Sequence, residues 1–262
     1  MGAVIKTFGA LIIGDEIMRG KRQDVHFAKL RQALAERGLV LAWAQYLGDD
    51  RQSLSATLRR TLASGDVVFS FGGIGATPDD HTRQAVATAA DVPLALHPEA
   101  EVLIRDRMRE MGRECTPAQL EMGLFPQGSR IVPNPYNRIP GFSFGDHHFF
   151  PGFPVMAHPM LEWTLDTYYR DCFHAIAEAE DAIIVWQGVE GLMQPLMVEV
   201  EKRYLSLKVF SLPSVATPER PSFVELGVRG DPNDIEPAME MLRTGVAALG
   251  YRWEALQASL QK

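Results

Sequence analysis

Residues 71–82 read FGGIGATPDDHT, and they follow the run DVVFS (66–70), which is typical of the end of a buried strand. Two glycine steps, a proline and two adjacent aspartates then lead into a segment with helical spacing that begins at Thr82. Closely spaced glycines let backbone N–H groups approach an anion, and a helix start adds positive potential. The same glycines also permit an ordinary turn in which Asp80 caps the helix. From these residues alone, the two interpretations are equally good.

The segments around this loop predict a parallel sheet. Strands are expected over residues 8–13, 39–47 and 67–71. Each is followed by a segment whose apolar residues recur at helical spacing, and the first of these, from Asp24, carries Phe27, Leu30 and Leu34. Alternating strands and helices favour an α/β domain with crossover helices. Ligands bind such sheets at the carboxyl ends of the strands, where the glycine loop lies.

The pattern changes after residue 182. Strand, helix, strand, strand, helix and strand follow one another up to residue 255, which predicts a small α+β domain of the ferredoxin-like kind. We expect the chain to divide into an α/β domain over residues 1–172 and this smaller domain over residues 173–262.

Composition excludes several classes of protein. The formal net charge of −7 argues against broad nucleic-acid binding, which needs clustered Lys and Arg, and the RGKR run (19–22) is the one short basic cluster near the start. Cys115 and Cys172 are far apart and match no CxxC pattern, so neither a disulfide framework nor a zinc cluster is expected. Without an apolar run near the roughly 20 residues of a membrane span, and without a signal peptide, we predict a cytoplasmic protein.

Acidic residues gather at the ends of the predicted strands and at the start of the first predicted helix. They are Asp15 and Glu16, Asp24, and Asp79 and Asp80. Carboxylates are the hard oxygen ligands that Mg²⁺ and Mn²⁺ accept, and a bound cation would offset their repulsion of a phosphate. Each one alone is more often a helix cap or a solvated surface group. Their shared placement favours a joint site over any single residue.

Four segments together resemble one family. GALIIGDEIMRGKRQDVHFAKLRQALAERG (9–38) resembles a GDE(L/I)-x-x-G-x-x-x-(D/N)-(T/S)-N opening, and FGGIGATPDDHTRQAVA (71–87) resembles a GG(L/T)GPT-x-DD-x-T loop. NPYNRIPGF (134–142) and HHFFPGFPVMAHPM (147–160) resemble the NP-x-G-x-APGF and LPGPP-x-EM segments of the same family. It is the molybdopterin-binding (MoaB/Mog-like) domain family, as it occurs in competence/damage-inducible protein A (CinA).

The resemblance implies a three-layer, Rossmann-like α/β domain that holds the phosphate of a pterin or nucleotide. The ligand-binding residues that it implies are Gly14, Asp15, Glu16, Asp24, Gly72, Gly73, Gly75, Thr77, Thr82, Pro151 and Gly152. Asp79 and Asp80 match the family's acidic pair and are the implied catalytic residues. Together with Asp15 they are also the implied ligands of Mg²⁺, Mn²⁺ or Co²⁺.

Two functions remain open. CinA-like relatives are associated with metal-dependent hydrolysis of ADP-ribose or FAD pyrophosphates, which makes this chain a candidate nucleotide pyrophosphatase. The alternative is a binding protein linked to molybdenum cofactor metabolism, and the departures from the family pattern motivate it. Val25 and His26 replace a hydroxyl residue and an asparagine, Ala76 replaces a proline, and Phe153 replaces a proline in the PGPP segment. Phe153 either stacks on a planar ring or fills the pocket.

Further expectations concern partners and histidines. The chain is shorter than the long forms with a C-terminal nicotinamide-nucleotide amidase domain, so we expect that activity to be absent. A small-molecule ligand and a homo-oligomer are expected, without nucleic acid or membrane as partners. His147 and His148 are adjacent in a predicted strand, so they point to opposite faces and cannot jointly hold one ion.

Overall fold

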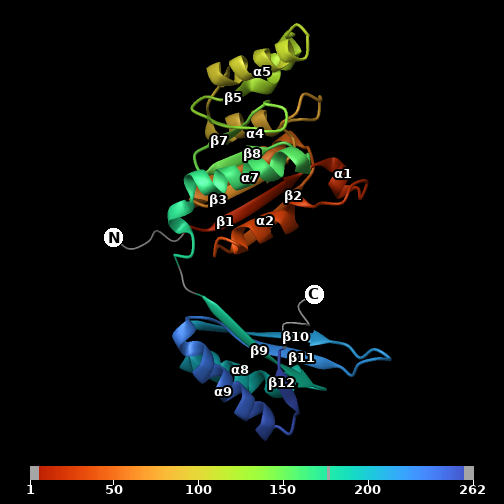
Figure 1. Ribbon diagram of the computed structural model, residues 1–262, viewed down its shortest axis with the longest axis vertical. Coiled ribbons are helices and arrows are strands. Elements are labelled where there is room, and N and C mark those ends of the chain that lie inside the picture. Colours follow the sequence, from red (N-terminus) through yellow and green to blue (C-terminus); the bar gives the residue numbers. More distant parts are fainter. Residues whose placement is uncertain (1–5, 176–177, 257–262) are drawn as a thin grey trace. The chain divides into compact units, whose positions relative to one another are not determined.

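The computed structural model describes residues 6–175 and 178–256. The chain divides into two compact units, Met1–Ala175 and Ile176–Lys262. The first unit carries the glycine loop, and the second is the small C-terminal domain (Figure 1). In the described part of the chain, none of the helices has the length and apolar character that crossing a membrane requires.

The first unit is built on a six-stranded sheet in the order β2-β1-β3-β8-β7-β6. Its strands are β1 (Phe8–Ile13), β2 (Leu41–Leu47), β3 (Val67–Phe71), β6 (Arg130–Val132), β7 (Gly141–Phe144) and β8 (His147–Phe150). The first three strands and β8 run parallel, whereas at one edge β7 pairs antiparallel with β8 and β6 pairs antiparallel with β7. The mostly parallel sheet that the alternating pattern predicted is confirmed.

Helices cover both faces of this sheet (Figure 1). α2 (His26–Ala35) and α7 (Pro154–Tyr168) pack on one face, and α3 (Arg51–Ser64) and α4 (Thr82–Ala90) pack on the other. Side chains of β1 alternate between the two apolar clusters, Ile12 in the first and Leu11 in the second. β1 and β3 are buried along their whole length, which explains their continuous apolar sequence. The three-layer α/β fold is therefore confirmed.

Shorter elements complete the first unit. They are α1 (Asp15–Met18), β4 (Leu94–Leu96), α5 (Pro98–Glu110), α6 (Pro117–Leu120), β5 (Leu124–Pro126) and the 3-10 turns η1 (Glu121–Gly123) and η2 (Arg170–Cys172). β4 and β5 pair as a separate two-stranded sheet. Three-residue strands are too short to show an alternating pattern, which is why the sequence did not predict this pair.

The first crossover helix differs in detail from its prediction. α2 begins at His26, and the Asp24 carboxylate accepts the N–H groups of His26 and Phe27 at 2.8 and 3.2 Å. Phe27 was expected in the apolar stripe but is 37% exposed, and His26 occupies a buried position instead. Leu30 and Leu34 are buried as expected. The helix is therefore rotated so that an imidazole, rather than a phenyl ring, faces the sheet.

The second unit has the predicted order of elements. They are β9 (Ala179–Trp186), α8 (Glu190–Arg203), β10 (Leu207–Ser214), β11 (Phe223–Gly230), α9 (Pro232–Ala248) and β12 (Trp253–Ala255). Its strands form an antiparallel sheet in the order β10-β11-β9-β12. Met193 of α8 and Leu242 of α9 share one apolar cluster with Val185 of the sheet. The ferredoxin-like βαββαβ arrangement is thereby confirmed.

Candidate functional site

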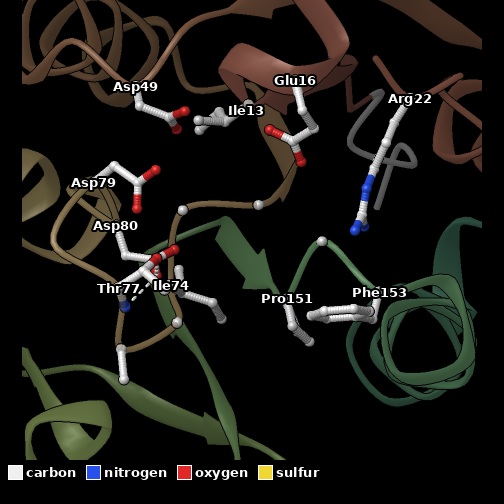
Figure 2. A pocket seen from close by; sticks show the side chains of 16 residues that line it. Ile13, Glu16, Arg22, Asp49, Ile74, Thr77, Asp79, Asp80, Pro151 and Phe153 are labelled. Atoms are coloured by element: carbon white, nitrogen blue, oxygen red, sulfur yellow. Dashed lines mark hydrogen bonds between the residues drawn. The ribbon is translucent and has the colours of Figure 1, made fainter.

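A cavity of about 440 Å³ lies at the carboxyl ends of β1, β3 and β8 (Figure 2). Four segments that are distant in sequence line it: the start of α1 with Arg22, the residue Asp49 after β2, the glycine loop, and residues 151–153 after β8. The parallel strands bring these loops to one edge of the sheet. This is where the sequence predicted a ligand site.

The glycine loop begins with a close backbone approach. A Cβ added to Gly72 would lie 2.1 Å from the carbonyl oxygen of Ile13, and Gly72 has a φ of 101°. Gly73 has a φ of 69°, and a Cβ there would lie 2.2 Å from the Thr82 hydroxyl oxygen. Both the conformation and the lack of space require glycine at these two positions. The loop is therefore held close to β1 and to α4.

Thr82, the first residue of α4, holds the start of the loop. Its hydroxyl donates to the carbonyl oxygen of Gly72 at 3.2 Å, and its backbone N–H donates to the carbonyl oxygen of Gly73 at 3.0 Å. The side chain is fully buried. Thr82 was predicted to bind ligand, but it does not line the cavity and instead fixes the two glycine peptides.

Arg83 holds the next two carbonyl groups. Its Nη1 donates to the carbonyl oxygen of Ile74 at 2.7 Å, and its Nη2 donates to that of Gly75 at 2.6 Å. The residue is only 4% exposed. Burial lowers the pKa of its guanidinium, and the nearby carboxylates Asp80 and Glu121 oppose that shift. Arg83, in the helix that was predicted to begin at Thr82, is thus buried and holds the loop in place.

The hydrogen bonds from Thr82 and Arg83 determine the direction of the N–H groups in the loop. In a planar trans peptide, the C=O and the following N–H point in opposite directions. The carbonyl groups of residues 72–75 point to the start of α4, so the N–H groups of residues 73–76 point away from it. These residues line the cavity, and within the described chain none of their four N–H groups has a protein acceptor. These four N–H groups are therefore available to bond with an occupant of the cavity.

The Asp80 carboxylate closes the loop upon itself. It accepts the N–H of Thr77 at 2.8 Å and also the Thr77 hydroxyl (Figure 2). The residue before α4 is His81, whose side chain makes no capping hydrogen bond. The interpretation in which Asp80 caps α4 is therefore wrong. Asp80 instead stabilises the turn that carries Thr77 and Asp79 to the cavity.

Acidic side chains make the cavity electronegative. Glu16, Asp49, Asp79 and Asp80 line it, and Arg22 is the basic residue among the lining residues. Burial raises the pKa of Asp49, and the carboxylates of Asp15, Glu16 and Asp79 add to that rise by repulsion. A free phosphate would meet the same repulsion unless the loop donors and a cation offset it.

Asp15 and Asp49 connect the loops that follow β1 and β2. The Asp15 N–H donates to Asp49 Oδ2 at 2.8 Å, and the Asp49 N–H donates to Asp15 Oδ1 at 3.3 Å. Asp15 Oδ2 also contacts Arg19 Nη2 at 2.7 Å. Asp15 therefore stabilises the loops beside the cavity and is not part of the cavity lining.

The predicted site residues separate into two groups. Those that line the cavity are Gly14, Glu16, Gly72, Gly73, Gly75, Thr77, Asp79, Asp80, Pro151 and Gly152. Asp15, Thr82 and Asp24 support it from outside, and Asp24 also accepts the Tyr46 hydroxyl at 2.7 Å. In residues 6–175 and 178–256, no group of three His, Cys, Asp or Glu side chains is arranged to hold a metal ion. The expected set Asp15, Asp79 and Asp80 is thus not assembled, because Asp15 pairs with Arg19 and Asp80 with Thr77.

Sequence reasoning missed three residues of the site. Asp49 was not among the predicted site residues, and the neighbouring Asp50 caps α3 by accepting the Ser53 N–H at 2.9 Å. Arg22 was noted as part of a basic run without a role. Arg83 carried no signal beyond its place one residue after Thr82. The one indication in the sequence was that Arg83 is a basic residue close after a loop with two acids.

Comparisons with known proteins show which proteins this chain resembles. A CinA-like protein of Anaeromyxobacter sp. (strain Fw109-5) is 35% identical over 160 residues, which cover 59% of this chain and 39% of that protein. A CinA-like protein of Geobacter metallireducens is 34% identical over 159 residues, with coverages of 59% and 38%. The chain thus spans about two fifths of the length of these curated relatives.

A solved structure and a family model also match this chain. The crystal structure of CinA from Thermoplasma acidophilum, a protein with unknown function, matches with a TM-score of 0.55 and 25% identity, over 62% of this chain and 96% of that chain. The family model described as "Probable molybdopterin binding domain" matches residues 9–171, which is more than half of the chain. The resemblance noted in the sequence is confirmed: the chain belongs to the "Probable molybdopterin binding domain" family.

Proposed function

We propose that the cavity binds the phosphate group of a pterin or nucleotide. The observation that carries this proposal is that residues 73–76 line the cavity and that their four successive N–H groups lack a protein acceptor in the described chain. Backbone N–H groups converging near a helix start form an anion site without any lysine. Arg22 adds one positive charge to the same cavity.

The class of ligand is supported by the family. The family description names molybdopterin, a pterin that carries a phosphate. A volume of about 440 Å³ is within the range of small-molecule sites, so a ring and a phosphate can both enter. The acidic lining disfavours a strongly charged anion on its own, which favours a phosphate presented by a larger organic ligand or together with a cation.

Calorimetric titration with inorganic pyrophosphate, ADP-ribose and FAD tests the proposal. Gly73→Ala should abolish binding, because its Cβ would displace Thr82 and turn the loop amides. Gly145→Ala is the matched control, because Gly145 also has a positive φ, 58°, but a Cβ there would meet no atom within 4 Å. Circular dichroism confirms that both variants fold. Absence of binding of every probe to the native protein would overturn the proposal.

A second candidate function is hydrolysis of a nucleotide pyrophosphate at the same place. The observation that favours it is a group of three carboxylates in the cavity lining, Glu16, Asp49 and Asp79, of which Asp49 and Asp79 lie on the side away from Phe153 (Figure 2). Like charges add to the rise in the pKa of Asp49 that burial causes, so a cation at this place would offset their repulsion. The donors are hard oxygens, as Mg²⁺, Mn²⁺ and Co²⁺ accept.

These residues fit a cation that is held jointly by protein and ligand. Mg²⁺ is often bound by one or two carboxylates together with substrate phosphates, so an assembled set of three protein ligands is not required. Asp49 and Asp79 would hold it, and bound there it would neutralise charge on the phosphoryl oxygens. The amides of residues 73–76 would hold the same oxygens as negative charge develops on them.

Hydrolysis is tested by product analysis after incubation of ADP-ribose or FAD with Mg²⁺, Mn²⁺ or Co²⁺. Asp79→Asn should remove turnover while leaving the unfolding temperature unchanged. Asp106→Asn, in α5, is the control, because within the described part of the chain Asp106 pairs only with Arg109 of its own helix. Saturable binding without product under all three metals would instead favour the binding function.

A further inference from the structure

We propose that Phe153 forms a subsite for a planar heteroaromatic ring, so that the cavity selects purine or pterin phosphates over phosphates without a ring. This proposal rests on the proposed phosphate-binding function. Phe153 lines the cavity, and 54% of its surface is exposed. Large aromatic side chains provide stacking faces that are tolerant of the identity of the base.

The backbone of Phe153 is held in place. It is the residue before α7, and its carbonyl oxygen accepts the N–H groups of Met156 and Ala157, both at 2.9 Å. Pro154 follows it and restricts the chain further. The ring is therefore mounted on a rigid helix start, and stacking on it would cost little backbone entropy.

His26 holds the residue before Phe153. The His26 Nε2 lies 3.2 Å from the carbonyl oxygen of Gly152, and its ring stacks on Phe71 with centroids 4.7 Å apart. A Cβ on Gly152 would lie 3.6 Å from Gly72 Cα, so the backbone that carries Phe153 touches the start of the glycine loop. The stacking face and the phosphate donors are thus parts of one fixed framework.

Arg22 lies beside the Phe153 ring. Its guanidinium carbon is 6.0 Å from the ring centroid, and both side chains extend into the cavity in Figure 2. The guanidinium is planar and stacks on aromatic faces as well as pairing with anions. Figure 2 also shows Asp49, Asp79 and Asp80 on the opposite side, with the glycine loop between the two sides. The arrangement therefore gives the ligand a direction, with its ring at Phe153 and its phosphate at the loop.

The experiment compares AMP with ribose 5-phosphate, which differ only in the adenine base. Titration calorimetry on the full chain should show AMP binding more tightly. Phe153→Ala should weaken AMP binding by about tenfold or more and leave ribose 5-phosphate binding unchanged. Phe153→Trp should preserve AMP binding. Tyr136→Ala is the control for loss of an exposed aromatic, because Tyr136 is 59% exposed and outside the cavity lining.

The outcomes separate this proposal from the function on which it rests. If the native protein binds both probes equally and Phe153→Ala changes neither affinity, the ring subsite is refuted and phosphate binding stands. An equal loss for both probes would also refute it, because Phe153 would then act only on the shape of the loop. If the native protein binds neither probe, both proposals fail.

Discussion

Arg83 Nη1 lies 2.7 Å from the carbonyl oxygen of Ile74, and this buried contact helps to decide which way the loop amides point. The same guanidinium holds the carbonyl group of Gly75 at 2.6 Å. A flexible turn would let these peptides rotate, and the N–H groups of residues 75 and 76 would then no longer converge on the cavity. Arg83 would thus orient the proposed anion site without lining the cavity itself.

Arg83→Met should therefore reduce both stability and binding. Two carbonyl groups would lose their donors, which should lower the free energy of unfolding by on the order of 3 kcal/mol. Affinity for pyrophosphate should fall even at temperatures where the variant is fully folded. Arg105→Met is the control, since Arg105 makes its ion pair with Glu101 on the surface of α5. Native affinity in the folded Arg83 variant would contradict the role assigned to Arg83.

The two adjacent aspartates should behave differently. Asp80→Asn weakens the acceptor for the Thr77 N–H and hydroxyl, so it should destabilise the loop by about 1 kcal/mol. Asp79→Asn should leave stability unchanged and strengthen metal-free binding of pyrophosphate, because it removes a negative charge from the cavity lining. Thermal unfolding and titration calorimetry measure the two effects. Identical behaviour of both variants would show that the structural distinction is wrong.

His26 is predicted to be a positioning residue for Phe153. Burial lowers the pKa of its imidazole, so it is neutral at pH 7, and Nε2 carries the proton because the Gly152 carbonyl can only accept. His26→Ala should weaken binding of AMP more than that of ribose 5-phosphate, whereas His26→Gln, which keeps a donor, should restore AMP binding. Equal losses for both probes, or failure of the glutamine to rescue, would assign His26 to packing alone.

Stability should fall with acid because of two buried histidines in β8. Burial lowers the pKa of His147 to about 4 and that of His148 to about 3, against an ordinary value of 6.5. The unfolded chain binds protons below pH 6.5 while the folded protein does not, so this stability is present above pH 6.5 and is lost as the pH falls toward 4. The slope should be about 1.4 kcal/mol per pH unit for each histidine.

Urea unfolding between pH 7.5 and 5 measures that slope. His147→Gln should reduce the slope by the contribution of one histidine, because the glutamine amide does not titrate. The amide can still bond to the Thr61 hydroxyl, which lies 2.9 Å from His147 Nε2. An unchanged slope in this variant would show that His147 gains its proton in the folded state as easily as in the unfolded one.

The sequence by itself determined the framework of the first unit. The apolar runs of β1 and β3 and the helical spacing after Thr82 place the glycine loop at a strand's carboxyl end, because burial of both sheet faces demands continuous apolar strands. The same kind of pattern sufficed for the order of elements in the C-terminal unit. Strands, helices and their order along the chain are local features, and the spacing of apolar residues indicates them directly.

Only the tertiary structure decided which polar residues face the cavity. Three aspartates lie near the same sheet edge but have different roles. Asp24 accepts N–H groups at the start of α2, and Asp49 lines the cavity. Asp15 connects the loops that follow β1 and β2. Arg83, one residue beyond the predicted loop, turned inward to bind two carbonyl groups. The physical reason is that a polar side chain takes whichever unpaired group the packed neighbours bring within reach, and the sequence does not state those neighbours.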